Sequence, residues 1–175
     1  MAKKQIGYLK PKKIADSQNT MMMVMSPMDA NHYGYVHGGA IMRYVDEAAF
    51  ISASRHSGRN TVTASIDQMG FHNPVHLGDL LILKSAVNYA GKTSMEVGIR
   101  IETENPVTGE TKYVGSAYVT MVALDDLGKP TKIPRLIYET ALEKERAEKA
   151  EKRRAFRLKM RKKSVKGTNH VWQRT

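Results

Sequence analysis

The chain has 175 residues, the size of one domain, which is enough to bury a hydrophobic core. Its composition, 41% hydrophobic and 26% charged, lies in the globular range and argues against wholesale disorder. It contains no cysteine, which excludes a disulfide framework, thiol catalysis and a Cys-ligated metal. No apolar run reaches the roughly 18 residues of a spanning helix, and none follows the basic N-terminus as a signal peptide requires. We therefore expect a soluble, cytoplasmic protein without a transmembrane segment.

The net charge of +11 is concentrated at the C-terminal end. Residues 141–175 hold 13 Lys and Arg against 4 Glu, whereas residues 1–140 hold 15 against 13 acidic residues. We interpret this tail as a solvated helix rather than a nucleic-acid or membrane site, since it offers only Phe156 and Trp172 for stacking on bases. We expect no specific nucleic-acid partner, and we expect removal of residues 145–175 to leave the activity of the rest nearly unchanged.

The N-terminal third of the chain predicts a leader, a strand, a loop and a helix. Residues 1–18 are polar and rich in lysine, and we expect a flexible, loosely held leader. The apolar run over residues 20–25 has the length of a strand, and residues 26–39, dense in Pro, Gly, Asp and Asn, are typical of a loop. Apolar residues then recur at helical spacing over residues 40–56, and Gly58 stands where a helix C-cap is expected.

Beyond Gly58 the hydrophobic period changes to that of strands. Hydrophobic and polar residues alternate over residues 95–102, and strands are also predicted over 61–71, 80–89 and 113–124. One long helix followed by an antiparallel meander of four strands predicts an α+β fold in which the sheet wraps the helix. Residues 137–163 are rich in Ala, Glu, Lys and Arg, and they predict a basic C-terminal helix that is mostly solvated.

Two adjacent glycines at the start of the long helix form a candidate ligand site. Without a Cβ, Gly38 and Gly39 let a ligand approach the free N–H groups of the first turn. The helix dipole makes this end suitable for an oxyanion or a polarised carbonyl. The glycines could equally serve close packing of the helix on the sheet, and their spacing does not decide between the two interpretations.

Two carboxylates, Asp46 and Glu47, follow on the same helix. Burying an acid is costly unless it has partners or a function. Asp46 shares its face with Met42 and Ala49 and is the stronger catalytic candidate, whereas Glu47 fits a solvated stripe. Asp46 lies eight residues after Gly38, about 12 Å along the helix axis. A carbonyl held at the helix N-terminus therefore cannot contact Asp46 of the same chain, and two chains are needed if both groups act on it.

The run over residues 26–48, which contains the two glycines and Asp46, resembles the core of the hotdog acyl-CoA thioesterases of the cytosolic acyl-CoA hydrolase type. The similarity covers residues 19–140 and continues through residues 54–56, 62–67, 71, 77–79, 92–97 and 133–135. It implies a hotdog fold and hydrolysis of medium- to long-chain acyl-CoA, with no cofactor beyond the coenzyme A of the substrate. It also implies a homo-oligomer whose active unit is a dimer, most often in a trimer of dimers.

The resemblance assigns roles to individual residues. Asp46 matches the catalytic carboxylate, which activates water or attacks the thioester, and Asn31 matches the asparagine supplied by the other subunit. Thr63 matches a hydroxyl that faces the carboxylate, and the backbone around Gly39 matches the oxyanion hole. Contacts to the pantetheine and phosphates of coenzyme A are implied for Gly91, Lys92, Thr93, Ser94 and, more weakly, Arg55.

Six histidines also invite a metal or triad interpretation. His72 and His76 flank Pro74 and do not share a helix face as zinc ligands would. No Gly-x-Ser-x-Gly element supplies a nucleophilic serine. A thioester carbonyl is already electrophilic, so an oriented water and a polarised carbonyl oxygen suffice for hydrolysis without a metal or a Cys nucleophile. We therefore expect no metal and no additional cofactor.

Two other functions compete with hydrolysis. His37 with a carboxylate of the long helix could imitate the His–acid pair of a hotdog hydratase or dehydratase, although we expect His37 to cap or pack. An acyl-CoA-binding sensor that contacts DNA is the second alternative, and the absence of a helix-turn-helix pattern counts against it. Asn31 and Thr63, which a hydrolase needs and a dehydratase does not, favour hydrolysis.

Overall fold

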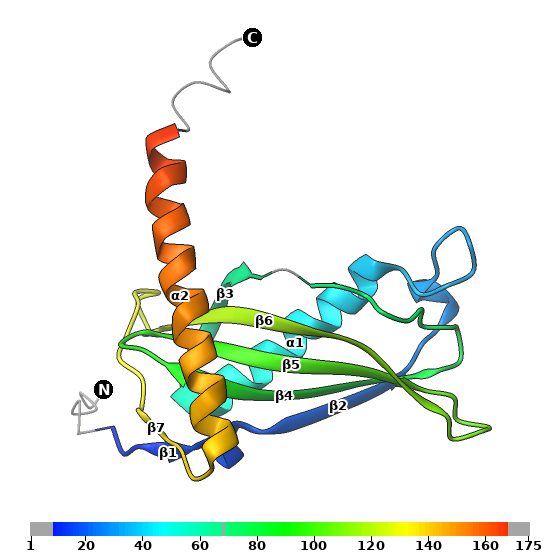
Figure 1. Cartoon of the computed structure of the whole chain (residues 1–175), viewed down its shortest axis with the longest axis horizontal. Helices are drawn as coiled ribbons and strands as arrows, with labels where there is room; N and C mark the ends of the chain where they lie inside the picture. Colours follow the sequence, from blue (N-terminus) through cyan, green and yellow to red (C-terminus); the bar gives the residue numbers. More distant parts are fainter. Residues whose placement is uncertain (1–8, 68, 168–175) are drawn as a thin grey trace.

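One long helix lies across a five-stranded antiparallel sheet, and a second helix stands at one end of it (Figure 1). The computed structural model describes residues 9–67 and 69–167. The central helix is α1 (Gly38–Ser57), and the second is α2 (Ala141–Gly167), which projects away from the body of the domain. Neither of these described helices has the length and apolarity that crossing a membrane requires.

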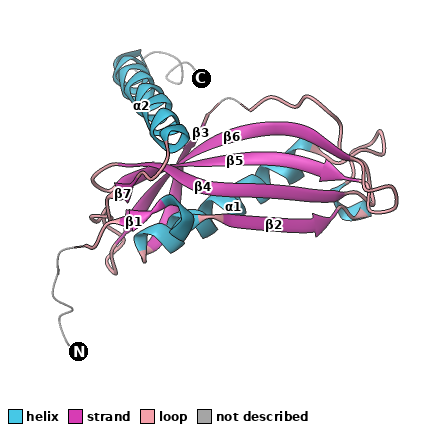
Figure 2. Cartoon of the chain, turned by 60° about the horizontal axis from the view of Figure 1, so that its bottom comes forward, coloured by secondary structure: helices cyan, strands magenta, loops and turns pink. Residues whose placement is uncertain are grey.

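The sheet has the order β2-β4-β5-β6-β3, with antiparallel pairing throughout. Figure 2 shows β4, β5 and β6 side by side, with α1 behind them. The five strands are β2 (Asn19–Val24), β3 (Asn60–Ile66), β4 (Leu80–Ala90), β5 (Ser94–Glu104) and β6 (Thr111–Leu124). The α+β hotdog architecture predicted from the sequence is confirmed.

The predicted four-strand meander is wrong for β3. This strand pairs with β6 rather than with β4, because α1 carries the chain across the sheet before β3 begins. It also ends at Ile66, five residues short of the predicted Phe71. A connection that contains Gly70 and Pro74 then returns the chain to β4. As a result, β3 is an edge strand whose outer side pairs with no strand in residues 9–67 and 69–167.

The helix α1 buries one face of small and branched side chains on the sheet. Ala48, Ala49 and Ala53 are fully buried and let the helix lie close to the strands. The helix begins at Gly38, two residues earlier than predicted, because His37 serves as its N-cap. The predicted C-cap is confirmed, since Gly58 has φ of 65°, a left-handed conformation that suits glycine.

Part of the predicted leader belongs to the folded domain. The short strands β1 (Lys12–Lys13) and β7 (Leu136–Ile137) pair in parallel, and a 3₁₀ turn over Ile14–Ser17 follows β1. Ile14 and Ser17 are buried, and the Ser17 hydroxyl accepts the backbone N–H of Val87 at 3.1 Å. The prediction of a loosely held leader is therefore wrong from residue 12 onward, because one apolar side chain and one hydroxyl hold this segment. Residues 1–8 lie outside the described part of the chain.

The basic helix α2 is mostly exposed, as predicted, but it is anchored to the outer face of the sheet. Glu96 of β5 is only 1% exposed and accepts two hydrogen bonds from Arg153, at 2.6 and 3.2 Å. Arg157 contacts Asp67 at 2.5 Å and Glu96 at 3.2 Å. A deletion that begins at residue 145 would leave a buried carboxylate without its partners. These ion pairs join the tail to the domain, and the expectation that removal of residues 145–175 leaves activity nearly unchanged stays a prediction.

Replacing Arg153 with methionine is expected to lower the free energy of unfolding by about 2 kcal/mol. This is less than the roughly 3–5 kcal/mol for breaking a fully buried ion pair, because Arg157 remains beside Glu96. Urea unfolding of the variant and of Arg154→Met, a matched change on the same helix, tests the expectation. Adding Glu96→Gln to the Arg153 variant should recover part of the loss. Equal stability of the Arg153 and Arg154 variants would contradict the anchoring role.

The buried His56 at the end of α1 should make stability depend on pH. Burial lowers the pKa of His56 below its ordinary value of 6.5, although its Nε2–H donates to the Pro134 carbonyl at 3.0 Å. The unfolded chain therefore binds the proton more readily, and stability is lost as pH falls from 6.5 through the folded-state pKa. Unfolding free energies measured across this window should fall less steeply for His56→Gln than for the wild type. The exposed-site control His32→Gln should keep the wild-type slope.

Candidate active site

Asp46 and Thr63 meet where the middle of α1 passes the edge strand β3. The Thr63 hydroxyl donates a hydrogen bond to Oδ1 of Asp46, and Sδ of Met121 lies 3.3 Å from the same hydroxyl. Asp46 is half-buried and Thr63 is exposed. The structure thus brings together two of the residues predicted for catalysis, and the hydroxyl fixes the orientation of the carboxylate.

This pair lines an open hollow of about 570 Å³. Its walls are Met21, Asp46, Glu47, Phe50, Ile51, Thr61, Val62, Thr63 and Met121. Oδ2 of Asp46 makes no hydrogen bond to any residue that the structure describes, so this oxygen can accept a proton from a water or contact a substrate. Glu47 is exposed and lies 3.6 Å from Arg43, which agrees with its predicted place on the solvated stripe.

Asn31 lies in the loop before α1, and its side chain shapes that loop. Its Oδ1 accepts the backbone N–H groups of Tyr33 and Tyr35, at 2.9 and 3.2 Å. These two bonds fix which side of the amide is oxygen, and they leave the Nδ2 group as a donor. Asn31 Nδ2 has no partner within the described chain. The arrangement makes Asn31 a hydrogen-bond donor toward any ligand.

The loop that carries Asn31 is held on α1 by the buried Asp29. The Asp29 carboxylate accepts hydrogen bonds from the hydroxyls of Ser26 and Tyr44, at 2.9 and 3.1 Å. Burial by itself would raise the pKa of Asp29, but the hydrogen bonds from Ser26 and Tyr44 and the charge of Arg43 lower it overall. No sequence pattern predicts this role of Asp29, because it depends on how the loop folds back on the helix.

The two glycines at the start of α1 differ in what their N–H groups do. The Gly39 N–H donates to Nδ1 of His37 at 2.8 Å, so the predicted capping role of His37 is confirmed. The Gly38 N–H has no partner among the described residues. A Cβ on Gly38 would lie 3.5 Å from the Phe71 ring, and one on Gly39 would lie 3.0 Å from the His37 ring. Neither ring belongs to the sheet, so these contacts do not support the interpretation that the glycines serve helix–sheet packing, while one N–H donor stays open.

The predicted site residues fall into three groups along α1. The Asn31 loop and Gly39 lie at its N-terminal end, the Asp46–Thr63 pair lies in the middle, and Arg55 lies in the last turn. Arg55 is nine residues beyond Asp46, about 13 Å along the axis. Gly39 is seven residues before Asp46, about 10 Å along the axis, so a single chain does not bring its Gly39 amide to its own Asp46.

The predicted coenzyme A turn lies at the Arg55 end of α1. Gly91, Lys92, Thr93 and Ser94 link β4 to β5, and the Gly91 N–H donates to the Ser94 carbonyl at 2.8 Å. The Lys92 carbonyl accepts the N–H of Ile133, and the next residue, Pro134, accepts the hydrogen bond of His56. These contacts connect the turn to the last turn of α1, where Arg55 is exposed.

Comparison with known proteins identifies the family. Residues 33–110, which include Asp46 and Thr63, match the family described as the Thioesterase superfamily. A solved acyl-CoA hydrolase from Bacillus cereus is 34% identical with a TM-score of 0.86, and the alignment covers 93% of this chain and 99% of that one. The chain belongs to the thioesterase superfamily. Within it, the similar proteins are acyl-CoA hydrolases of the hotdog fold.

Two curated relatives of this thioesterase carry related names. The acyl-CoA thioester hydrolase YkhA of Bacillus subtilis, called uncharacterized, is 42% identical over 65% of this chain and 66% of its own length. The cytosolic acyl coenzyme A thioester hydrolase of Rattus norvegicus is 34% identical over 82% of this chain. The match spans only 38% of the rat protein, so the chain corresponds to less than half of that relative.

Two further solved structures bear on assembly and ligand. A hexameric acyl-CoA thioesterase without ligand is 36% identical, with a TM-score of 0.82 and coverage of 87% of this chain and 97% of that one. An acyl-CoA hydrolase from Staphylococcus aureus, solved with butyryl coenzyme A, is 35% identical, with a TM-score of 0.82 and coverage of 89% and 96%. Variants of that hydrolase in which an aspartate, a threonine or an asparagine is replaced by alanine have also been solved.

Sequence reasoning missed several residues of the site. Met121, Phe50 and Val62 line the hollow around Asp46, yet no motif pointed to them. Strand alternation could have assigned Met121 to the core face of its strand. Only the unexpected pairing of β3 with β6 places it beside Thr63, at residue 63 opposite residue 121 in the register.

Proposed function

We propose that this thioesterase hydrolyses medium- to long-chain acyl-CoA to a free fatty acid and coenzyme A in the cytoplasm, with Asp46 as its catalytic carboxylate. The observation that carries the proposal is the Asp46–Thr63 pair, which leaves Oδ2 of Asp46 free in an open hollow. The same three residue types, aspartate, threonine and asparagine, were replaced in the Staphylococcus aureus hydrolase. The chain offers each of them at Asp46, Thr63 and Asn31.

In the proposed reaction Asp46 acts as a general base. Its Oδ2 takes a proton from a water molecule, and the water oxygen forms a bond to the thioester carbonyl carbon. The carbonyl π electrons move onto oxygen, and they return as the carbon–sulfur bond breaks and the coenzyme A thiolate leaves. The proton held by Asp46 then goes to the thiolate. Attack by Asp46 itself would form a mixed anhydride that water hydrolyses, and both routes use the same carboxylate.

The site is proposed to be completed by a second chain. A carbonyl at the first turn of α1 is about 12 Å from Asp46 of the same helix. Beside Asp46, the unpaired edge of β3 and three exposed apolar side chains offer a surface for a partner; these side chains are Met42, Phe50 and Val62. In such a dimer the partner supplies the Asn31 amide and the backbone donors at Gly38 and Gly39. The hexameric relative supports a trimer of these dimers.

The donors at the start of α1 would polarise the thioester carbonyl. Gly38 already has a free N–H, whereas the Gly39 N–H must leave Nδ1 of His37 to join it. Coenzyme A would extend from there, with its pantetheine and phosphates on the turn formed by Gly91, Lys92, Thr93 and Ser94, and on Arg55. Arg55 and Lys92 are exposed cations suited to phosphate.

A thioester-cleavage assay tests the proposed activity. Incubation with butyryl-, octanoyl-, dodecanoyl- and palmitoyl-CoA should release one free thiol and one carboxylic acid per substrate consumed. The highest kcat/KM is expected for the longer chains. Saturable binding without thiol release would instead indicate a sensor, and hydration of an enoyl-CoA with the thioester intact would indicate a hydratase. If butyryl-CoA were turned over fastest, the proposed chain length would be wrong but the thioesterase activity would stand.

Asn31→Asp separates the two roles of the Asn31 side chain. An aspartate keeps the acceptor for the N–H groups of Tyr33 and Tyr35, but it cannot donate to substrate or water. We expect kcat to fall by about a hundredfold, as for loss of one preorganised donor, while the melting temperature stays close to that of the wild type. Asn31→Ala should lose both activity and some stability. Full activity of Asn31→Asp would show that only the loop-shaping role matters.

A further inference from the structure

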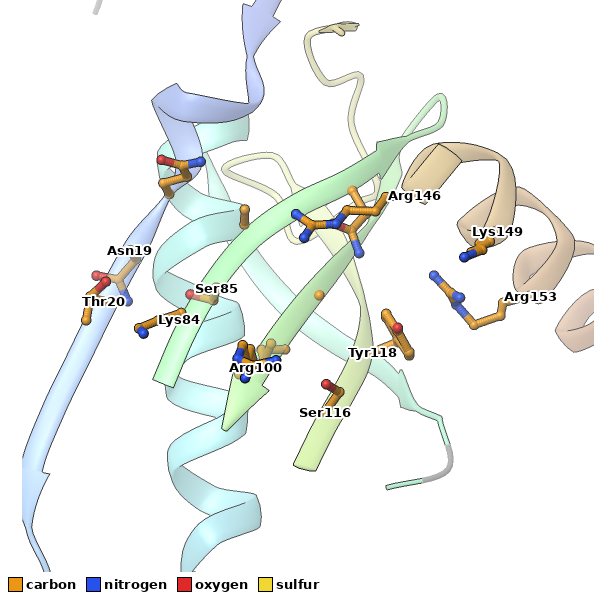
Figure 3. A pocket seen from close by; sticks show the side chains of 15 residues that line it. Asn19, Thr20, Lys84, Ser85, Arg100, Ser116, Tyr118, Arg146, Lys149 and Arg153 are labelled. Atoms are coloured by element: carbon orange, nitrogen blue, oxygen red, sulfur yellow. The ribbon is translucent and has the colours of Figure 1, made fainter. Parts of the chain in front are cut away.

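A groove of about 470 Å³ lies on the outer face of the sheet, away from the Asp46 hollow and under α2. In Figure 3, Arg146, Lys149 and Arg153 reach from α2 toward the strands, and Lys84 and Arg100 lie further along the sheet. None of its lining residues is assigned to catalysis or to coenzyme A in the proposed function. Its size falls within the range of about 300–1,000 Å³ that small-molecule sites occupy.

The floor of the groove is made by small residues on three adjacent strands. Gly98 of β5 pairs with Ala86 of β4, and Ser116 of β6 pairs with Arg100. These positions leave a depression in the outer face, while the longer side chains of Lys84 and Arg100 form one wall. The opposite wall is α2, which the contacts of Arg153 with Glu96 hold in place.

Asn88 offers its amide to this groove from the floor. The residue is 7% exposed, and its amide makes no hydrogen bond to another described residue but is not fully enclosed. Its amide lies over Gly98 so closely that a Cβ at that position would be 2.3 Å from Nδ2. Because the amide is not fully enclosed, it reaches the groove and can donate to a ligand or water there. Glycine at position 98 is what gives the amide room in the floor.

The charges around the groove favour an anion. Five of its lining residues are cations and none is a carboxylate. Lys84 and Arg100 share Glu102, and their hydrogen bonds lower the pKa of Glu102, while Lys149 pairs with Glu145. Arg146 forms no ion pair with a described carboxylate. Cations on both walls and an amide donor in the floor match a ligand with more than one phosphate, since phosphates accept charge-assisted hydrogen bonds from several directions.

We propose that this groove binds a small anion that carries a diphosphate. Arg146 and Lys149 contact the phosphates from α2, and Nδ2 of Asn88 donates from the floor. Lys84 and Arg100 add positive potential from the other wall. The diphosphate can be free or part of an organic molecule, and both sources share the same recognition chemistry. The site is independent of thioester hydrolysis and does not rest on the proposed function.

Titration calorimetry of the 175-residue chain with pyrophosphate and with uridine diphosphate tests the site. We expect saturable binding of at least one probe, weakened at least tenfold by Arg146→Gln, Lys149→Gln or Asn88→Ala, because each removes a donor to the phosphates. Binding should also weaken with added salt. Tighter binding of uridine diphosphate would identify an organic diphosphate as the ligand, and equal affinity would identify the diphosphate alone.

Matched variants keep the test specific. Lys152→Gln and Arg154→Gln remove the same charges from α2 at positions that do not line the groove, and they should bind the probes within about twofold of the wild type. Lys92→Gln, at the proposed coenzyme A turn, should also have no effect. The proposal fails if neither probe binds at millimolar concentration, if the groove variants bind normally, or if Lys92→Gln or the control variants of α2 abolish binding. Arg146 is exposed, so its replacement tests the site without risk to the fold.

Discussion

Replacing Asp46 with alanine is expected to lower kcat by at least two orders of magnitude in a protein that remains folded. Asp46 is half-buried, and the Thr63 hydroxyl is the hydrogen-bond donor that orients it. Alanine removes the proton acceptor and leaves only a hydroxyl that can bond to water. Asp46→Asn should be nearly as inactive, because an amide keeps the shape and can still contact Thr63 but is not a base.

Glu47→Gln is the matched control for these variants. Glu47 is the next residue on the same helix and borders the same hollow, but it is exposed and pairs only with Arg43. We expect its kcat to stay within about threefold of the wild type, since a surface ion pair contributes little. Steady-state kinetics with a soluble acyl-CoA, and circular dichroism to verify folding, are the measurements. Asp46 would be excluded from the chemistry if Asp46→Ala kept more than about a tenth of wild-type turnover. Such a variant would have raised the activation barrier by less than ~1.4 kcal/mol.

Local periodicity predicted most of the fold, because each element carries its own signal. The alternation in β5 and the helical spacing in α1 are visible in a short window of sequence, and Gly58 marks the end of the helix. The position of β3 could not be read this way. Pairing with β6 depends on where α1 sends the chain, which is a property of the whole topology rather than of residues 60–66.

The basic tail shows a second limit of reading one segment at a time. Arg153 and Arg157 look like solvated charges, because a helix with so few apolar residues has no stripe to bury. Their partners are far away in sequence, since Glu96 lies in β5 and Asp67 directly follows β3. Glu96 itself resembles the solvent-facing residue of an alternating strand, and only the packing of α2 across that face makes it buried.

The candidate site was predictable where a residue's chemistry conflicts with its surroundings. An acid among apolar residues pointed to Asp46, and the structure places Thr63 beside it, as the family resemblance implied. Helix capping by His37 and oxyanion binding at Gly39 were each predicted from the sequence. That both roles use the same Gly39 N–H was not predicted, and the structure shows this N–H bonded to His37. The outer groove gave no motif at all, since Asn88, Gly98 and Arg146 come together only through the register of β4 with β5 and the docking of α2.

Mixing two inactive variants is expected to restore activity if each site is shared between chains. Oligomers of Asp46→Ala alone should be inactive, and those of Asn31→Ala alone should be strongly impaired. In a mixed dimer, the intact Asn31 of the first variant faces the intact Asp46 of the second at one of the two sites, while the other site lacks both. Random pairing makes about half of the dimers mixed, so co-refolding at equal ratio should restore about a quarter of wild-type activity.

The structural reason for this expectation is the separation of the two groups on one chain. Asn31 Oδ1 is held by its own loop at the start of α1, and Asp46 lies about 12 Å along that helix from Gly38. The hydrogen bond between Tyr44 and Asp29 holds the loop on its own helix. Activity is measured against mixing ratio, with separately refolded variants combined afterwards as the control, and mass spectrometry verifies mixed dimers. Mixed dimers that show no recovery at any ratio would place both residues in the site of a single chain and rule out the shared arrangement.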